Sequence, residues 1–345
     1  MLKVVKREGD EWRSGEIVHA FGGRGVVRVL EYEDGAALLE RIVPGTNLVE
    51  LTRADHDDAA TEAIAQVIAA IAPNAAPPWC PTVSDWAQSF TWYSDSGDAQ
   101  IPAPLVRRAS EIYTELCETQ RGARLLHGDL QHYNVLRDHH RGWLAIDPKG
   151  VVGEGEYEVG ALLRNPVELP AILSNPATIE QRIRTLSSRL NLDAGRVLRW
   201  GFAQAVLSAI WYVEDGYVID ASNPSLQLAR AIDAMFDPGA SILTRRNGKH
   251  ILTVSEYLLK HPAGCPWRSD SPRHPRPTEE GPAACRSSRQ GLPDQQAGDL
   301  AAPQDPEGRT TRERSRRGHT ASVPARPCRI RICSRLPRSV LDHRA

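Results

Sequence analysis

Cysteine and long hydrophobic runs are scarce in this sequence, and each shortage excludes a class of protein. Only two of the six cysteines, Cys80 and Cys117, fall within the first 261 residues, and neither belongs to a C-x-x-C pair. A zinc site or a disulfide framework is therefore not expected. No segment approaches the roughly 18 uninterrupted apolar residues of a membrane span. The charged start, Met1–Lys6, does not resemble a signal peptide, so we expect a cytoplasmic protein with no membrane partner.

Lysine and aromatic residues are nearly absent from the last part of the chain. Residues 262–345 contain 16 Arg, no Lys, 9 acidic residues, one aromatic residue (Trp267) and 12 of the 25 prolines. Such a segment cannot bury enough apolar surface to offset the entropy lost on ordering it. We therefore expect a disordered tail over residues 251–345. Its Arg-only basic content beside Pro, Ala, Ser and Gly suggests out-of-frame translation of a GC-rich gene, and a genuine basic interaction tail is the alternative.

The charge of the remaining chain has the opposite sign. Its first 261 residues hold 26 basic and 34 acidic residues. An acidic protein suits a cationic small molecule, although acidic surfaces also serve solubility alone. The arginines of the tail lack interleaved aromatic residues and a folded platform, so no nucleic-acid partner is expected.

Strand-like segments come first along the chain and helical segments come later. The patterns predict strands over Leu2–Val5, Val26–Glu31 and Ala36–Leu39, with a helix over Glu11–Phe21. Later apolar periodicity predicts helices over Asp55–Ala72, Pro104–Glu118, Ile179–Leu190 and Arg196–Val213. This order indicates an α+β protein with a small sheet-bearing lobe followed by a larger, mostly helical one.

One window, Leu125–Gly150 (LLHGDLQHYNVLRDHHRGWLAIDPKG), carries the chemistry. An apolar strand leads to His127-Gly128-Asp129, Asn134 follows, and the apolar strand Trp143–Ile146 ends on Asp147. Phosphoryl transfer needs a carboxylate to orient the acceptor hydroxyl and oxygen ligands for Mg²⁺. The spacing H-x-D-x-x-x-x-N, followed by an Asp at a strand end, supplies them in the order of the protein-kinase template. Singly these residues could form turns or a helix cap, but their conjunction favours a phosphotransferase.

The same residues resemble a known family. HGDLQHYN followed by RGWLAIDPKGVVGE is similar to the streptomycin 6-kinase and hydroxyurea phosphotransferase branch of the aminoglycoside phosphotransferases. That branch typically shows H-G-D-L-H-x-x-N and then R-G-W-L-x-I-D-P-x-G-x-x-G-E, so Gln131 stands where the family often has His. The resemblance runs from Met1 to about Phe236. It implies a protein-kinase-like two-lobe fold, with residues 1–42 as the remnant of a truncated nucleotide-binding lobe and residues 43–250 as the helical catalytic and acceptor-binding lobe.

The resemblance implies a role for each polar residue of the motif and for a charged pair near the start of the chain. These residues are Asp129 as the catalytic base, Asn134 and Asp147 as ligands of Mg²⁺, and Lys3 as the residue that binds the ATP phosphates. The expected carboxylate partner of Lys3 is Glu11, with Glu16 as the fallback.

The resemblance also implies an acceptor site in the helical lobe. Glu154 and Trp211 are the expected contacts, with Glu156, Glu158, Glu214 and Asp215 as further candidates. Carboxylates suit a guanidinium or ammonium group through charge-assisted hydrogen bonds. The alternatives are that Glu154 lies in a solvated loop and that Trp211 belongs to a helix core.

The activity that follows is transfer of the γ-phosphate of ATP to a hydroxyl of an aminoglycoside, first of all streptomycin, which would confer antibiotic resistance. We expect the protein to be a monomer or a weak dimer. A kinase for hydroxyurea or another small molecule is the alternative. In the family, two strands and a phosphate-covering loop precede the lysine strand, whereas this chain begins on that strand and Gly22–Gly25 comes too late to replace the loop. We therefore expect impaired nucleotide binding, and an inactive truncated remnant is the third reading.

Overall fold

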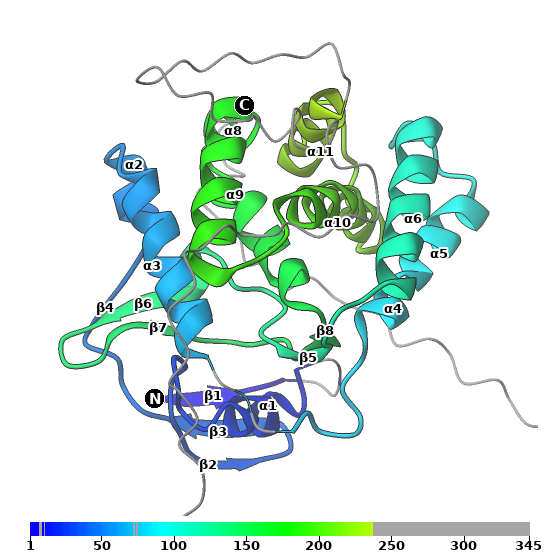
Figure 1. The fold of residues 1–345 in the computed structure, drawn as a ribbon. Helices are drawn as coiled ribbons and strands as arrows, with labels where there is room; N and C mark the ends of the chain where they lie inside the picture. Colours follow the sequence, from blue (N-terminus) through cyan, green and yellow to red (C-terminus); the bar gives the residue numbers. More distant parts are fainter. Residues whose placement is uncertain (7–8, 10, 72, 74, 237–345) are drawn as a thin grey trace, which may run out of the picture. The chain divides into compact units, whose positions relative to one another are not determined.

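The computed structural model describes residues 1–6, 9, 11–71, 73 and 75–236 (Figure 1). The predicted tail, residues 251–345, lies outside the described residues, as does the end of the predicted helical lobe. Within the described residues, a strand-rich beginning is followed by a mostly helical part. The α+β class predicted from the sequence is therefore confirmed, while the domain boundary at residues 42–43 stays a prediction.

The first sheet contains three antiparallel strands in the order β1-β3-β2, namely β1 (Leu2–Val4), β3 (Ala36–Leu39) and β2 (Val29–Glu33). Helix α1 (Ser14–Ala20) packs against β2 and β3. A Cβ on Gly15 would lie 2.5 Å from Cβ of Tyr32, so the absence of a side chain there lets the helix approach the sheet.

Strand β2 begins three residues later than predicted because the preceding residues join another strand. The N–H of Val27 donates to the carbonyl of Ala145 (2.9 Å), and the N–H of Ala145 donates to the carbonyl of Gly25 (2.8 Å). Arg141 adds hydrogen bonds from its guanidinium to the carbonyls of Gly23 and Val26. The glycine-rich turn is thus bound to the strand that leads to Asp147.

Five short strands surround the motif found in the sequence. One sheet has the order β4-β6-β7, from β4 (Pro44–Asn47), β6 (Val135–Asp138) and β7 (Gly142–Ala145). The other is the antiparallel pair of β5 (Arg124–Leu126) and β8 (Val151–Gly153). The short helices η1 (His132–Asn134) and η2 (Gly155–Val159) follow β5 and β8.

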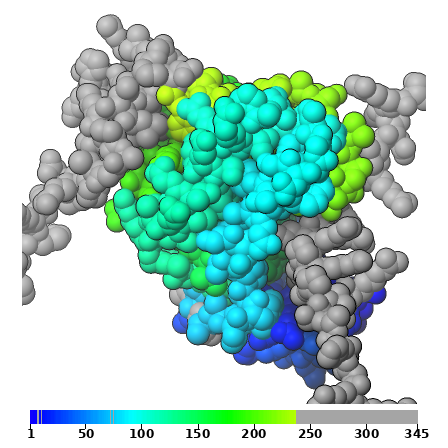
Figure 2. All heavy atoms as spheres, turned by 90° about the vertical axis from the view of Figure 1, so that its right-hand side faces the viewer, coloured from blue at the N-terminus to red at the C-terminus, as the bar shows by residue number. Residues whose placement is uncertain are grey.

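Helix α10 (Ala194–Glu214) is the centre of the helical part. Sixteen of its residues are buried, and it contacts α5 (Gln88–Ser96), α6 (Ala103–Glu118), α9 (Pro176–Leu190) and α11 (Pro224–Met235) (Figure 1). Figure 2 shows α5 and α6 in cyan, with α11 in yellow-green beside them. The remaining helices are α2 (Val49–Arg53), α3 (Asp57–Ala70), α4 (Val83–Trp86), α7 (Gly160–Leu163) and α8 (Pro170–Leu173).

Side-chain caps explain where the helices of this part begin. Asn175 accepts a hydrogen bond from the N–H of Ala177, so α9 starts at Pro176, ahead of the predicted Ile179. Asp193 accepts from the N–H of Arg196 at the start of α10. Each cap satisfies a backbone donor that lacks an intrahelical partner. No helix of the described ranges is long and apolar enough to cross a membrane.

A buried arginine joins three segments of the helical part. Arg182 on α9 is 1% exposed and binds both carboxylate oxygens of Asp57, at the start of α3, over 2.9 and 2.6 Å. Its Nη1 also donates to the carbonyls of Leu162 (3.0 Å) and Asn165 (2.9 Å). A buried cation satisfied on every side resists removal because its partners would be left unpaired.

We expect Arg182→Ala to lower the free energy of unfolding by about 3–5 kcal/mol, because it leaves a carboxylate and two carbonyls without their donor. Urea denaturation measures this change. Arg189→Ala is the matched control, since Arg189 also joins α9 to α3 through Glu62 (3.0 Å) but is 63% exposed. The control should lose less than about 1 kcal/mol. Equal losses in the two variants would contradict the role given to Arg182.

Candidate active site

A buried carboxylate holds the backbone that leads to Asp129. Glu158 on η2 accepts hydrogen bonds from the N–H groups of His127 (2.7 Å) and Gly128 (2.9 Å). The ring of His127 is fully buried, with Nε2 at 2.9 Å from the carbonyl of Ile146. Burial lowers the pKa of His127 to about 4, so the ring is neutral near pH 7. His127 therefore links the two motif strands and carries no charge into the site.

Asp129 has a different partner on each carboxylate oxygen. Nδ2 of Asn134 donates to Oδ2 of Asp129 (3.1 Å) and to its backbone carbonyl (2.8 Å). Nη2 of Arg164 lies 3.5 Å from Oδ1. Burial raises the pKa of Asp129, and Arg164 and Lys149 oppose that effect without cancelling it. A raised pKa and a partly exposed side chain suit a carboxylate that accepts a proton.

Asp147 lies beside Asn134 and adopts an uncommon backbone conformation. The N–H of Ile146 donates to the carbonyl of Asn134 (2.9 Å), which brings the two predicted ligands together. The φ angle of Asp147 is 59°, in the left-handed region that Asp tolerates better than most residues. Burial alone would raise the pKa of Asp147, but Lys3, together with Lys149 and His127, outweighs it and the net shift is downward. The site thus offers an ionised carboxylate and an amide oxygen, the hard donors that Mg²⁺ prefers.

Lys3 lies between two carboxylates. Its Nζ forms an ion pair with Oδ1 of Asp147 and lies 3.2 Å from Oε2 of Glu11. The fallback partner, Glu16, instead accepts a hydrogen bond from Nε1 of Trp79 (2.8 Å). The structure therefore pairs Lys3 with Glu11, and the role of this pair in nucleotide binding stays a prediction.

Two cations of the site were missed in the sequence. Nζ of Lys149 binds Oε1 of Glu11 (2.9 Å), so the two oxygens of this carboxylate each hold a lysine. Arg164 reaches Asp129 from the end of α7, and its Nη1 donates to Oε1 of Gln204 (3.1 Å). Lys149 stands two residues after Asp147, and this position in the sequence could have indicated that it belongs to the site. Nothing local marks Arg164, because only the tertiary fold brings it to Asp129.

The two predicted acceptor contacts lie in the core. Glu154 is fully buried, and its Oε1 accepts from Arg196 (2.6 Å) and from Nε1 of Trp200 (2.6 Å). Trp211 is 6% exposed and donates from Nε1 to the hydroxyl of Ser89 (3.1 Å). The placement of Glu154 excludes the solvated-loop alternative, and that of Trp211 matches the helix-core alternative. These placements speak against an acceptor contact for both residues, because a substrate could reach either side chain only by displacing its buried partners.

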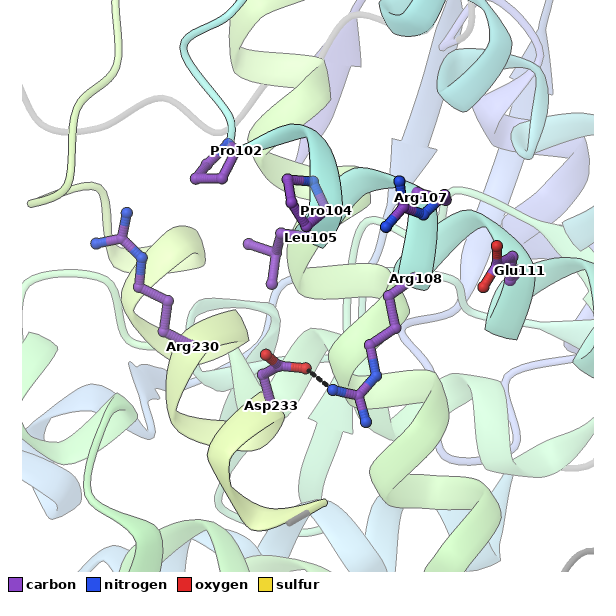
Figure 3. A pocket seen from close by; sticks show the side chains of 8 residues that line it. All are labelled: Pro102, Pro104, Leu105, Arg107, Arg108, Glu111, Arg230 and Asp233. Atoms are coloured by element: carbon purple, nitrogen blue, oxygen red, sulfur yellow. Dashed lines mark hydrogen bonds and ion pairs between the residues drawn. The ribbon is translucent and has the colours of Figure 1, made fainter.

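A shallow pocket elsewhere in the helical part holds none of the predicted residues. It has a volume of about 580 Å³ and lies between α6 and α11. Figure 3 shows Arg107, Arg108 and Arg230 around it, with Arg108 bound to Asp233 (2.6 Å). Glu111 and Asp233 also line this pocket, so it carries charges of both signs.

The comparisons with known proteins agree with the motif. The model of the aminoglycoside/hydroxyurea antibiotic resistance kinase family matches residues 1–216. The chain belongs to this family. Among curated members, streptomycin 3''-kinase of Klebsiella pneumoniae is 33% identical over 223 residues, which cover 63% of this chain and 80% of the relative. Hydroxyurea phosphotransferase of Kitasatospora aureofaciens is 30% identical over 242 residues, which cover 63% and 67%.

Solved structures of kinases are also similar to this family member. The choline/ethanolamine kinase family protein from Mesorhizobium loti has a TM-score of 0.48 and 17% identity, covering 69% of this chain and 82% of that protein. A thermostable mutant of aminoglycoside phosphotransferase APH(4)-Ia has a TM-score of 0.49 and 17% identity, covering 68% and 86%. The resemblance read from the sequence is confirmed by the family match, and the kinase-like fold class with it.

The burial of Glu158 makes the stability of the protein depend on pH. Burial raises its pKa from 4.5 to about 7, so ionisation opposes folding. Its contribution to stability is therefore full below about pH 4.5 and is lost as the pH rises to about 7. Glu158→Gln cannot ionise, so the unfolding free energy of the wild type should fall relative to that of the variant by about 3 kcal/mol over this range. Urea denaturation of both proteins between pH 4.5 and 8 measures it, and parallel pH profiles would contradict the assignment.

Proposed function

We propose that this chain transfers the γ-phosphoryl group of ATP to a hydroxyl of an aminoglycoside, with streptomycin as the first acceptor. The observation that carries the proposal is the convergence of Asp129, Asn134, Asp147 and Lys3, which come from three separate parts of the sequence. The family membership supports a small-molecule kinase.

The residues present fit the cofactors that this reaction requires. Asn134 and Asp147 would hold Mg²⁺ through oxygen atoms, and Lys3 would bind the ATP phosphates while Glu11 holds its ammonium in place. Bound Mg²⁺ neutralises phosphate charge and orients the group to be transferred. Lys3 must exchange its ion pair with Asp147 for a phosphate, which leaves that carboxylate free to bind the metal.

Asp129 is the proposed base. The oxygen Oδ1 has the weaker of the two side-chain contacts, 3.5 Å from Arg164, so it can accept the proton of the acceptor hydroxyl. The hydroxyl oxygen then bonds to the γ-phosphorus while the bond to the β–γ bridging oxygen breaks. Asn134 keeps Oδ2 in place throughout, because its Nδ2 binds both that oxygen and the backbone of Asp129.

Streptomycin is proposed first because a streptomycin kinase is 33% identical to this chain. A kinase for hydroxyurea is the second candidate, favoured by the 30% identical hydroxyurea phosphotransferase. The acidic composition of the first 261 residues suits a cationic acceptor better than neutral hydroxyurea. With Glu154 and Trp211 in the core, Glu214 and Asp215 at the end of α10 become the preferred acceptor candidates.

The test is ADP release by the purified full chain with Mg-ATP and streptomycin, kanamycin or hydroxyurea. We expect turnover with streptomycin, and we expect Asp129→Asn to lower kcat by about 100- to 10,000-fold, because an amide cannot accept the proton. Asp138→Asn is the matched control, since Asp138 lies at the end of β6 and its carboxylate accepts hydrogen bonds from backbone N–H groups, those of His140 and Arg141 in its turn and that of Val43.

Each outcome separates the candidates. Turnover with hydroxyurea alone would select the second candidate. If ATP binds but no ADP is released with any of the three acceptors, both candidate functions are rejected. Equal activity of Asp129→Asn and the wild type would reject the assigned base whatever the acceptor.

A further inference from the structure

Lys149 is a cation of the site to which the motif assigns no task. Its Nζ lies 2.9 Å from Oε1 of Glu11, while Lys3 lies 3.2 Å from Oε2 of the same carboxylate. Burial lowers the pKa of Lys149, but Glu11, then Asp147 and Asp129, outweigh burial and raise it. The ammonium of Lys149 is thus held beside that of Lys3, which in turn forms an ion pair with Asp147, a proposed metal ligand.

The backbone around Lys149 is held in one conformation. Its N–H donates to the carbonyl of His127 (2.8 Å), directly beside the segment that carries Asp129. Asp147 and Gly150 flank it with φ angles of 59° and 74°. A Cβ on Gly150 would lie 2.5 Å from Cδ1 of Ile17, so a side chain at this position would have to displace the side chain of Ile17 on α1. The side chain of Lys149 thus starts from a backbone that is bonded to His127, in the segment that leads to Asp129.

Lys3 and Lys149 each hold one oxygen of Glu11, so two cations lie side by side in the site. In the kinase template a single lysine beside the carboxylate contacts the α- and β-phosphates, the task proposed here for Lys3. The γ-phosphoryl group, which must pass to the hydroxyl held by Asp129, then needs a cation nearer to Asp129. The N–H of Lys149 donates to the carbonyl of His127, two residues before Asp129, and a Cβ on Gly128 would lie 3.6 Å from the Cβ of Lys149, so Lys149 starts beside the segment that carries the base.

We propose that Lys149 is a further catalytic residue whose ammonium contacts the γ-phosphoryl group during its transfer. This inference rests on the proposed function. As the acceptor oxygen bonds to phosphorus and the bond to the departing ADP oxygen breaks, negative charge stays on the three remaining oxygens of the group. The ammonium of Lys149 donates a hydrogen bond to one of them, gives up no proton, and keeps its link to Glu11. The hydroxyl proton passes to Asp129.

The experiment compares ATP with ADP, because only ATP carries a γ-phosphate. Kd values for ADP and for a non-hydrolysable ATP analogue are measured by calorimetry with Mg²⁺, beside kcat with the acceptor. Lys149→Gln, which can still donate to Glu11, should weaken binding of the ATP analogue about tenfold, the loss expected for one charge-assisted hydrogen bond. Its Kd for ADP should change less than about twofold, and kcat should fall at least as much as the analogue's affinity.

Three further variants complete the comparison. Lys3→Met should weaken binding of both nucleotides, because its proposed contacts are to phosphates that they share. Lys6→Met removes the same charge from an exposed position near β1 and should change neither affinity. Lys149→Arg keeps the cation and should restore most of the selectivity for the ATP analogue.

The possible results are distinct. Equal weakening of ADP and the ATP analogue by Lys149→Gln would overturn the inference, because a structural role disturbs both nucleotides alike. Unchanged affinities and kcat would also overturn it. If the wild type binds neither nucleotide, the proposed function fails and the inference fails with it, which is visible before any variant is made. Should Lys149→Gln not fold by circular dichroism, Lys149→Met is measured in its place, with the same expectations.

Discussion

The ammonium of Lys3, shared by Glu11 and Asp147, is the contact on which the candidate site depends. Lys3 lies on β1, Glu11 precedes α1, and Asp147 follows β7, so one cation joins the start of the chain to a residue 144 positions away. Asp147 needs such a partner, because a non-glycine residue in the left-handed region is held there only by its surroundings. The bond also keeps its carboxylate ionised, which is the state that a metal requires.

The helical part holds the other half of the site. The carboxylate of Glu158 on η2 binds the N–H groups that precede Asp129. Gln204 on α10 donates to the carbonyl of Tyr157 (2.7 Å) and holds Arg164 against Asp129. The base is thus positioned by the central helix, and its orientation depends on packing rather than on the loop alone. This packing buries both carboxyl groups, and burial raises the pKa of Glu158 and of Asp129.

Predictions from the sequence succeeded where the signal was local. Strand β3 and the end of α6 match the predicted bounds because alternation and helical periodicity depend on neighbouring residues. The predictions for Glu154 and Trp211 placed them at an acceptor surface, where a carboxylate and an aromatic ring are common. Arg196 and Trp200, more than 40 positions from Glu154, provide the partners that bury it. No pattern around Glu154 contains that information.

The sequence by itself determined the class of chemistry, because the residues of H-G-D-L-Q-H-Y-N and I-D-P-K-G stand close together and at a spacing that few functions require. It also determined the order of strands and helices. The tertiary structure decided which carboxylate pairs with Lys3, that Lys149 shares it, and that Arg164 faces Asp129. These choices depend on distances between segments separated by up to 144 positions, and only packing of the whole fold sets such distances.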